Sequence, residues 1–320
     1  MQNKTKIQDK SLWRTFLKVM QWILPLFICL LLYKKFYKNT AFSFSDFVSQ
    51  LKSISVFWYL LLVVSSLINW SLETYKWQIL LKKFNPLSFK QAFVSVLSGV
   101  AVSQLLPYKM GEYLGRLVYV KDKNKWNAGL LSVVGSYSQL LITLVLGFIS
   151  FLILKPIPYA QHFAISLGLL IVIGFFLYWF LPYFNFTKKY LVTSKLETAL
   201  KLTNRKDLLC VLTISLVRYL SFLLPYSLFA WQLGLSNHAP FVFHILAVSC
   251  IFFMQTVTPN FILTDIAIRL TVPLVIFTLN GALSTLGFEY LPGIIVYIFN
   301  VVLPMIIGTL FIIFAKLKRS

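Results

Sequence analysis

Long apolar runs constrain the fold of this chain more than any other feature of its sequence. A helix needs about 20 mostly apolar residues to cross the hydrocarbon core of a membrane. Runs of this kind lie near 17–33, 54–72, 128–154, 161–184, 208–234 and 291–315. Only 12% of the residues are charged, against about 25% in soluble domains, so there is too little polar surface to coat a soluble globule. We predict an all-α integral membrane protein with about six full transmembrane helices in one domain over residues 1–320.

Two further apolar regions, 91–120 and 241–280, are each interrupted by a proline and a carboxylate near the middle. Non-helical backbone is tolerated at membrane depth only when it is buried in protein or lines a wet cavity. We therefore predict two re-entrant or broken helical hairpins. The first region carries Gln104, Pro107, Gly111, Glu112 and Arg116, and the second carries Gln255, Pro259, Asp265 and Arg269.

The polar residues of the two regions follow the same order, which suggests an internal repeat. Glu112 and Asp265 are 153 residues apart, and so are Arg116 and Arg269. Chance is the alternative, because short degenerate patterns match easily. A repeat is favoured, since the chain has only nine acidic residues and two of them occupy its broken apolar regions. The predicted halves are approximately 17–154 and 161–315.

The distribution of basic residues predicts the orientation. Cytoplasmic loops of membrane proteins are enriched in Lys and Arg. With the N-terminus inside and both hairpins re-entrant, the inside segments hold 23 basic residues and the outside segments hold five. Parity then places both termini inside. The two hairpins then enter from opposite sides, which is the inverted-repeat arrangement of many secondary transporters, with a ligand site near the midplane.

Each predicted hairpin offers a carboxylate and a guanidinium at its break. A proline ends the incoming helix, and the positive end of the next helix favours the carboxylate. A charge inside the membrane costs at least about 3 kcal/mol and therefore marks function by default. The alternative is a purely structural role, in which Arg116 only neutralises Glu112 and Arg269 only neutralises Asp265. We expect these four residues to bind the substrate, with Gln104 and Gln255 as polar support and Pro107, Gly111 and Pro259 at the helix breaks.

Other polar residues give weaker indications. Glu73 and Lys76 lie one turn apart near aromatic residues, which favours a surface ion pair in an interfacial aromatic belt; the alternative is that Lys76 reaches the first hairpin. Arg218 lies deep in an apolar run and could serve a headgroup site or a structural pair. In the run 128–154, Tyr137 and Gln139 are candidates for a cavity lining, beside a close-packing face made by Ser132, Gly135, Ser136 and Ser138.

Several classes of site are not expected. The three cysteines form no CxxC pair, and the histidines form no HExxH motif, so we predict no metal and no cofactor. No Walker A pattern is present, so ATP would not act directly, and the driving force would come from product removal, membrane potential or protons titrating Glu112 and Asp265. The net charge of +21 points to an anionic lipid surface rather than nucleic acid, because the basic residues lie mostly between apolar runs.

The sequence resembles the transmembrane region of lysylphosphatidylglycerol synthases, also described as a flippase-like domain. The matching residues are Lys76-Trp77, Leu80-Leu81, Leu106-Pro107, Gly111-Glu112 and Arg116. Tyr108 stands where the family usually has Gly, and the second motif lacks glycine. The resemblance implies that the chain lies in the cytoplasmic membrane and moves an anionic, aminoacylated or glycosylated lipid between its leaflets.

The first hypothesis is a translocase, for which we expect no catalytic residues, and two alternatives remain open. One is an intramembrane transferase acting on a lipid-linked substrate, and the other is a non-transporting membrane partner of a separate biosynthetic enzyme. The family's synthases carry a soluble aminoacyl-transfer domain, whereas this chain ends at Ser320, five residues after the last predicted span. We therefore do not expect lysyl transfer from this polypeptide, and the expected partner is a membrane lipid.

Overall fold

A computed structural model describes residues 44–103, 110–154, 161–183, 200–201, 203–233, 239–258, 262–281 and 291–317, and these residues contain helices and no strand. The predicted all-α class is confirmed. The helices before the middle of the chain are α2 (Phe44–Ser53), α3 (Val56–Leu81), α4 (Phe89–Ser103), α5 (Met110–Gly115), η2 (Asp122–Asn124) and α6 (Lys125–Leu154). They are followed by α7 (Gln161–Phe180), η3 (Leu181–Tyr183), α9 (Arg205–Gln232), α10 (Phe241–Val257), α11 (Ile262–Leu279), α12 (Leu291–Tyr297), the π-helical η4 (Ile298–Val302) and α13 (Leu303–Leu317).

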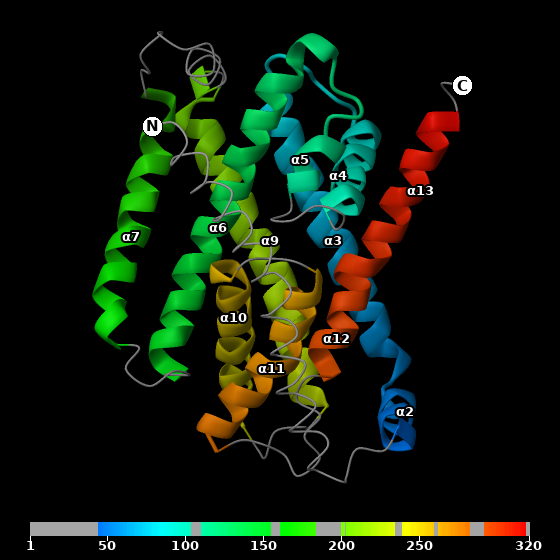
Figure 1. The fold of residues 1–320 in the computed structure, drawn as a ribbon, viewed down its shortest axis with the longest axis vertical. Helices are drawn as coiled ribbons and strands as arrows, with labels where there is room; N and C mark the ends of the chain where they lie inside the picture. Colours follow the sequence, from blue (N-terminus) through cyan, green and yellow to red (C-terminus); the bar gives the residue numbers. More distant parts are fainter. Residues whose placement is uncertain are drawn as a thin grey trace, which may run out of the picture.

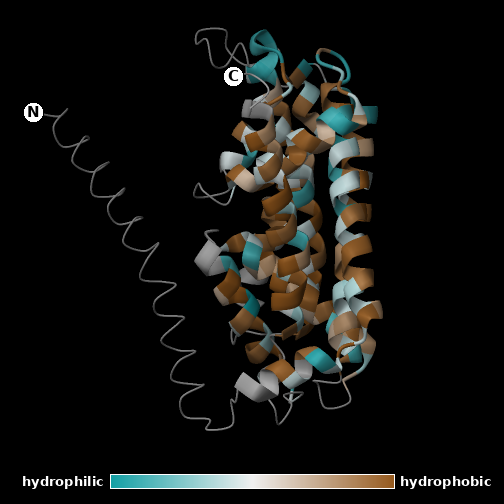
Figure 2. Ribbon diagram, turned by 90° about the vertical axis from the view of Figure 1, so that its right-hand side faces the viewer, coloured by the Kyte–Doolittle hydropathy of each residue, from teal (hydrophilic) through white to brown (hydrophobic). Residues whose placement is uncertain are grey.

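Within the described residues, five helical segments are long and apolar enough to cross a membrane, and they match the predicted spans after the first. They are Val56–Leu81, Asp122–Leu154, Ile165–Tyr183, Arg205–Gln232 and Leu291–Phe314. The predicted span 17–33 lies outside the described residues. Hydrophilic residues gather mainly at the two ends of the molecule and apolar residues along its middle (Figure 2), as expected for a bundle that spans a bilayer.

Both interrupted regions form pairs of helices that occupy opposite halves of the bundle. Helices α4 and α5 pack together in the half that contains the C-terminus, whereas α10 and α11 lie in the other half (Figure 1). Helix α4 has 15 residues and is about 22 Å long, which is less than the roughly 30 Å of a hydrocarbon core. It ends at Ser103, and α10 ends at Val257, each shortly before the expected proline. Pro107, Pro259 and Gln104 themselves lie outside the described residues.

Two glycines allow α5 to pack backbone to backbone against α4. A Cβ atom on Gly111 would lie 2.1 Å from the carbonyl oxygen of Val102, and one on Gly115 would lie 2.4 Å from that of Ser98. Any side chain at these positions would collide with backbone atoms, which cannot move aside as a flexible side chain can. The glycines therefore hold Glu112 and Arg116 at a fixed position beside α4.

Helix α3 supplies hydrogen-bond donors to backbone carbonyls that proline residues leave without a helical donor. Pro225 inside α9 has no N–H, so the carbonyl of Ser221, four residues earlier, lacks its helical donor. The hydroxyl of Ser65 donates to this carbonyl over 2.7 Å. Such cross-helix bonds are how proline is accommodated at membrane depth, and this one joins α3 to α9.

The two ends of the bundle differ in charge and in structure. At the end that contains the C-terminus, the Asn204 side chain caps α9 by accepting from the Asp207 backbone N–H at 2.7 Å. Asp207 forms ion pairs with Lys82 and Lys83, just after α3. The opposite end holds α2 (Figure 1), a short helix that the sequence analysis did not predict.

Candidate functional site

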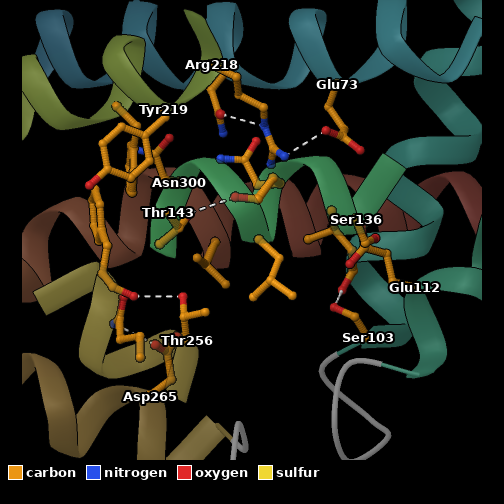
Figure 3. Close-up of a pocket in the computed structure, with 18 of the residues that line it drawn as sticks. Glu73, Ser103, Glu112, Ser136, Thr143, Arg218, Tyr219, Thr256, Asp265 and Asn300 are labelled. Atoms are coloured by element: carbon orange, nitrogen blue, oxygen red, sulfur yellow. Dashed lines mark hydrogen bonds and ion pairs between the residues drawn. The ribbon is translucent and has the colours of Figure 1, made fainter. Parts of the chain in front are cut away.

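A cavity of about 490 Å³ lies where the inner ends of the two helical hairpins meet the spanning helices. Figure 3 shows side chains from α3, α4, α5, α6, α9, α10, α11 and η4 around it. Its volume falls in the range of small-molecule sites, roughly 300–1,000 Å³. Its charged lining residues are three acids and three bases: Glu73, Glu112, Asp265, Lys76, Arg218 and Arg269.

Glu73 is the centre of a buried charge cluster beside this cavity. One carboxylate oxygen lies 2.7 Å from Arg116 Nη2. The other oxygen lies 2.7 Å from both Lys76 Nζ and Arg218 Nη1. Arg116 also pairs with Glu112, one turn earlier. Three cations and two carboxylates therefore carry a net charge of +1, and they join α3, the α5 hairpin and α9.

Neighbouring side chains fix the two arginines of the cluster in place. The guanidinium of Arg116 lies over the Trp77 ring, 5.6 Å from its centroid, and that of Arg218 lies 5.3 Å from the centroid of the Trp70 ring. Arg218 Nε also donates to the Asn69 side-chain oxygen at 2.8 Å. Contacts between guanidinium groups and aromatic faces are more favourable when both are removed from water, so these rings act as packing surfaces for the charges.

The second hairpin carries a smaller polar group that is separate from the Glu73 cluster. The Gln255 amide donates to Asp265 Oδ1 at 2.7 Å, and Arg269 Nε lies 3.5 Å from the same oxygen. Arg269 also lies over the Tyr297 ring at 5.1 Å. Each hairpin therefore has an acid paired with the arginine four residues later, as the sequence analysis predicts for internal neutralisation.

The predicted surface location of Glu73 and Lys76 is wrong. Helix α3 continues past 72 to Leu81, so these residues lie inside the bundle and are 1% and 0% exposed. Lys76 Nζ donates to the Gly135 carbonyl oxygen at 3.2 Å and reaches the first hairpin only through Glu73. The sequence signal that draws attention to Glu73 is its rarity, because it is one of nine acids and directly follows the apolar run 54–72.

Of the other residues predicted to line a site, the structure places Arg218 and Gln139 at the cavity but not Tyr137. Arg218 forms an ion pair with Glu73 and also lines the cavity. Gln139 lines the cavity, whereas the Tyr137 hydroxyl donates to the Gly174 carbonyl oxygen. Asn69 and Asn300 also line the cavity, and sequence reasoning missed both although each is a polar residue in an apolar run.

Solvent access separates the charges that a ligand could reach from those that hold the site together. Among the cations, the side chain of Arg218 is 18% exposed and those of Lys76 and Arg116 are 1% exposed. Among the acids, Glu112 is 22% exposed and Glu73 is 2% exposed. Within the described residues, no group of three His, Cys, Asp or Glu side chains could hold a metal ion.

Comparison with known families identifies the type of protein. The family described as the lysylphosphatidylglycerol synthase TM region matches residues 22–264, which is well over half of the chain. The chain belongs to this family. Comparison with curated proteins and with solved structures gives no match.

The match to the lysylphosphatidylglycerol synthase TM region covers most, but not all, of the cavity wall. It includes the Glu73 cluster, the first hairpin and Arg218, and it ends one residue before Asp265. The acid and the arginine of the second hairpin, and Asn300 in η4, lie beyond it. The family assignment therefore rests on the part of the site that contains the Glu73 cluster, and it does not extend to Asp265, Arg269 and Asn300.

Proposed function

We propose that this protein is a lipid translocase that passes a headgroup between leaflets through the cavity, without changing the lipid chemically. The observation that carries the proposal is one cavity lined by charges from two hairpins that enter from opposite ends of the bundle. A lipid headgroup needs polar partners at membrane depth, because each unsatisfied polar group there costs several kcal/mol. The cavity supplies such partners between two half-length hairpins.

The accessible charges suggest how a headgroup would bind. Arg218 is the most exposed cation of the Glu73 cluster and offers a guanidinium, the side chain best suited to phosphate. Glu112 and Asp265 offer carboxylates on the two hairpins, for hydroxyl or amino groups. We also propose that the protein lies in the cytoplasmic membrane with its basic end towards the cytoplasm, where that end contacts the anionic lipid surface. Association with a separate biosynthetic enzyme belongs to the same proposal.

The test is leaflet exchange in vesicles that contain the purified protein. The probe is phosphatidylglycerol with a fluorescent group on one acyl chain, and dithionite quenches only the outer leaflet. We expect Glu112→Gln and Asp265→Asn each to slow exchange at least about tenfold, because a hydrogen bond to a charged group contributes roughly 1.5–3 kcal/mol and 1.4 kcal/mol is a factor of ten. The matched control is Asp122→Asn, since Asp122 pairs with Lys125 at an exposed turn.

Three results would count against this proposal, the first against its mechanism and the other two against translocation itself. Exchange at the wild-type rate in both cavity variants would remove the carboxylates from the mechanism. A folded wild type that moves no probe, with or without an imposed membrane potential, would support a non-transporting partner. A probe recovered with altered mass would support a transferase.

A further inference from the structure

The π-helical segment η4 presents an unusual polar residue to the cavity. Pro304 has no N–H, so it cannot donate to the carbonyls four and five residues earlier, those of Asn300 and Phe299. The Trp70 ring N–H donates to this carbonyl at 3.2 Å, and the Ser66 hydroxyl donates to the Phe299 carbonyl at 3.0 Å. Helix α3 therefore holds the widened turn in place from outside. Such single-turn π segments occur frequently at functional sites.

The Asn300 side chain lines the cavity with no partner. It is 2% exposed, and neither its amide nitrogen nor its amide oxygen has a hydrogen-bond partner within the described part of the chain. Gln139, from α6, also lines the cavity, and its side-chain oxygen is also buried without a partner. Buried amides are nearly always hydrogen-bonded, so each exception needs an explanation. One amide nitrogen and two amide oxygens without partners therefore belong to two residues that line the same cavity.

Arg218 lies next to this group of unpaired atoms. Trp70 contacts both sides, because its ring lies under the Arg218 guanidinium and its N–H donates to the Asn300 carbonyl. Figure 3 shows Asn300 and Arg218 along the same wall of the cavity. A ligand whose phosphate meets Arg218 therefore has its adjoining group close to Asn300.

We propose that Asn300 determines specificity by recognising hydroxyl groups next to a phosphate, with Gln139 as a second acceptor. This rests on the proposed function and narrows its substrate to glycerol- or sugar-bearing phosphates. An ammonium group would satisfy the two acceptors and leave the Asn300 amide N–H groups unpaired. A phosphate oxygen would satisfy the donor and leave both acceptors unpaired. A hydroxyl donates and accepts, so a pair of hydroxyls satisfies all three atoms.

The test compares two short-chain lipids that have the same charge. Dihexanoyl phosphatidylglycerol carries two headgroup hydroxyls, and dihexanoyl phosphatidylmethanol carries none. We expect the purified full-length protein in detergent to bind phosphatidylglycerol about tenfold more tightly, because a site with paired donors and acceptors rejects a ligand that lacks them. Asn300→Leu, which is similar in size, should reduce the ratio to about one.

Two further variants keep the result interpretable. Gln139→Met should lower the same ratio partially, and it serves as the readout if Asn300→Leu does not fold. Asn280→Leu is the matched control, because Asn280 is an exposed amide at the end of α11 that donates to the Ile276 carbonyl oxygen. It should leave the ratio unchanged. An unchanged ratio in a folded Asn300→Leu protein, or no preference in the wild type, would overturn the inference.

Additional arms separate this inference from translocation and from a soluble ligand. If the wild type binds selectively but exchanges neither lipid between leaflets, recognition stands and the proposed translocation fails. If it exchanges both lipids at equal rates and binds them equally, translocation stands and recognition fails. Water-soluble glycerol 1-phosphate is tested against methyl phosphate; an Asn300-dependent preference there, without one for the lipids, would assign the subsite to a free phosphate and overturn its role in lipid recognition.

Discussion

At the scale of single residues, Glu73 determines the charge balance of the cavity wall. Its two oxygens accept from Lys76, Arg116 and Arg218, and all these contacts are 2.7 Å. Removing one partner of a buried ion pair leaves an uncompensated charge and costs about 3–5 kcal/mol. Of the charges in the cluster, Glu73 has the most partners, so its loss affects three cations at once.

We therefore expect Glu73→Gln to lower the free energy of unfolding by about 3–5 kcal/mol, measured by denaturant titration in detergent. The double variant Glu73→Gln with Lys76→Met returns the cluster to its original net charge and should recover part of the loss. Such coupling between contacting residues is what a double-mutant cycle detects. If Glu73→Gln unfolds at the wild-type midpoint, or if the two losses simply add, Glu73 does not organise the cluster.

At the scale of helices, the α4–α5 hairpin depends on contact between two backbones. A Cβ at Gly115 would lie 2.4 Å from the Ser98 carbonyl oxygen and 2.6 Å from the Gly99 Cα. Overpacking of this kind typically costs about 1–3 kcal/mol. Because Arg116 follows directly, displacement of α5 would also move this guanidinium away from Glu73.

We predict that Gly115→Ala lowers the free energy of unfolding by about 1–3 kcal/mol and also slows leaflet exchange. Gly129→Ala is the matched control, because nothing lies within 4 Å of a Cβ added there, and alanine in a helix is favoured over glycine by up to about 1 kcal/mol. It should be neutral or slightly stabilising. Equal effects of the two substitutions would mean that the hairpin tolerates a wider separation.

How much of this architecture can be predicted from sequence depends on how local the signal is. A proline and a carboxylate within an apolar run are rare, so both hairpins and their acid–arginine pairs are visible in the sequence. The burial of Glu73 is not, because it depends on Arg116 and Arg218, which lie 43 and 145 residues away. The π segment is also invisible locally, since its freed carbonyls are stabilised by Ser66 and Trp70 of α3.

At the scale of the whole molecule, charge is distributed unevenly between the two ends of the bundle. Among the described residues outside the cavity, the end that contains the C-terminus carries nearly all the basic residues, whereas Lys52 lies at the opposite end, in the last turn of α2. The basic residues at the first end include Lys82, Lys83, Lys90, Lys121, Lys123, Lys125, Lys201, Arg205 and Lys206. Basic residues in short loops set orientation because they are retained on the cytoplasmic side.

We therefore predict that the α4–α5 hairpin enters the membrane from the cytoplasmic side and that the α10–α11 hairpin enters it from the outside. Single cysteines at Lys123 and Asn280, both exposed and at opposite ends, are introduced after Cys29, Cys210 and Cys250 are replaced by alanine. In intact cells, a membrane-impermeant maleimide should label Asn280→Cys at once and Lys123→Cys only after permeabilisation. The reverse pattern would invert the assignment of the hairpins. Labelling of both in intact cells would mean that the chain inserts in two orientations, so that the charge difference between its ends does not fix which hairpin faces the cytoplasm.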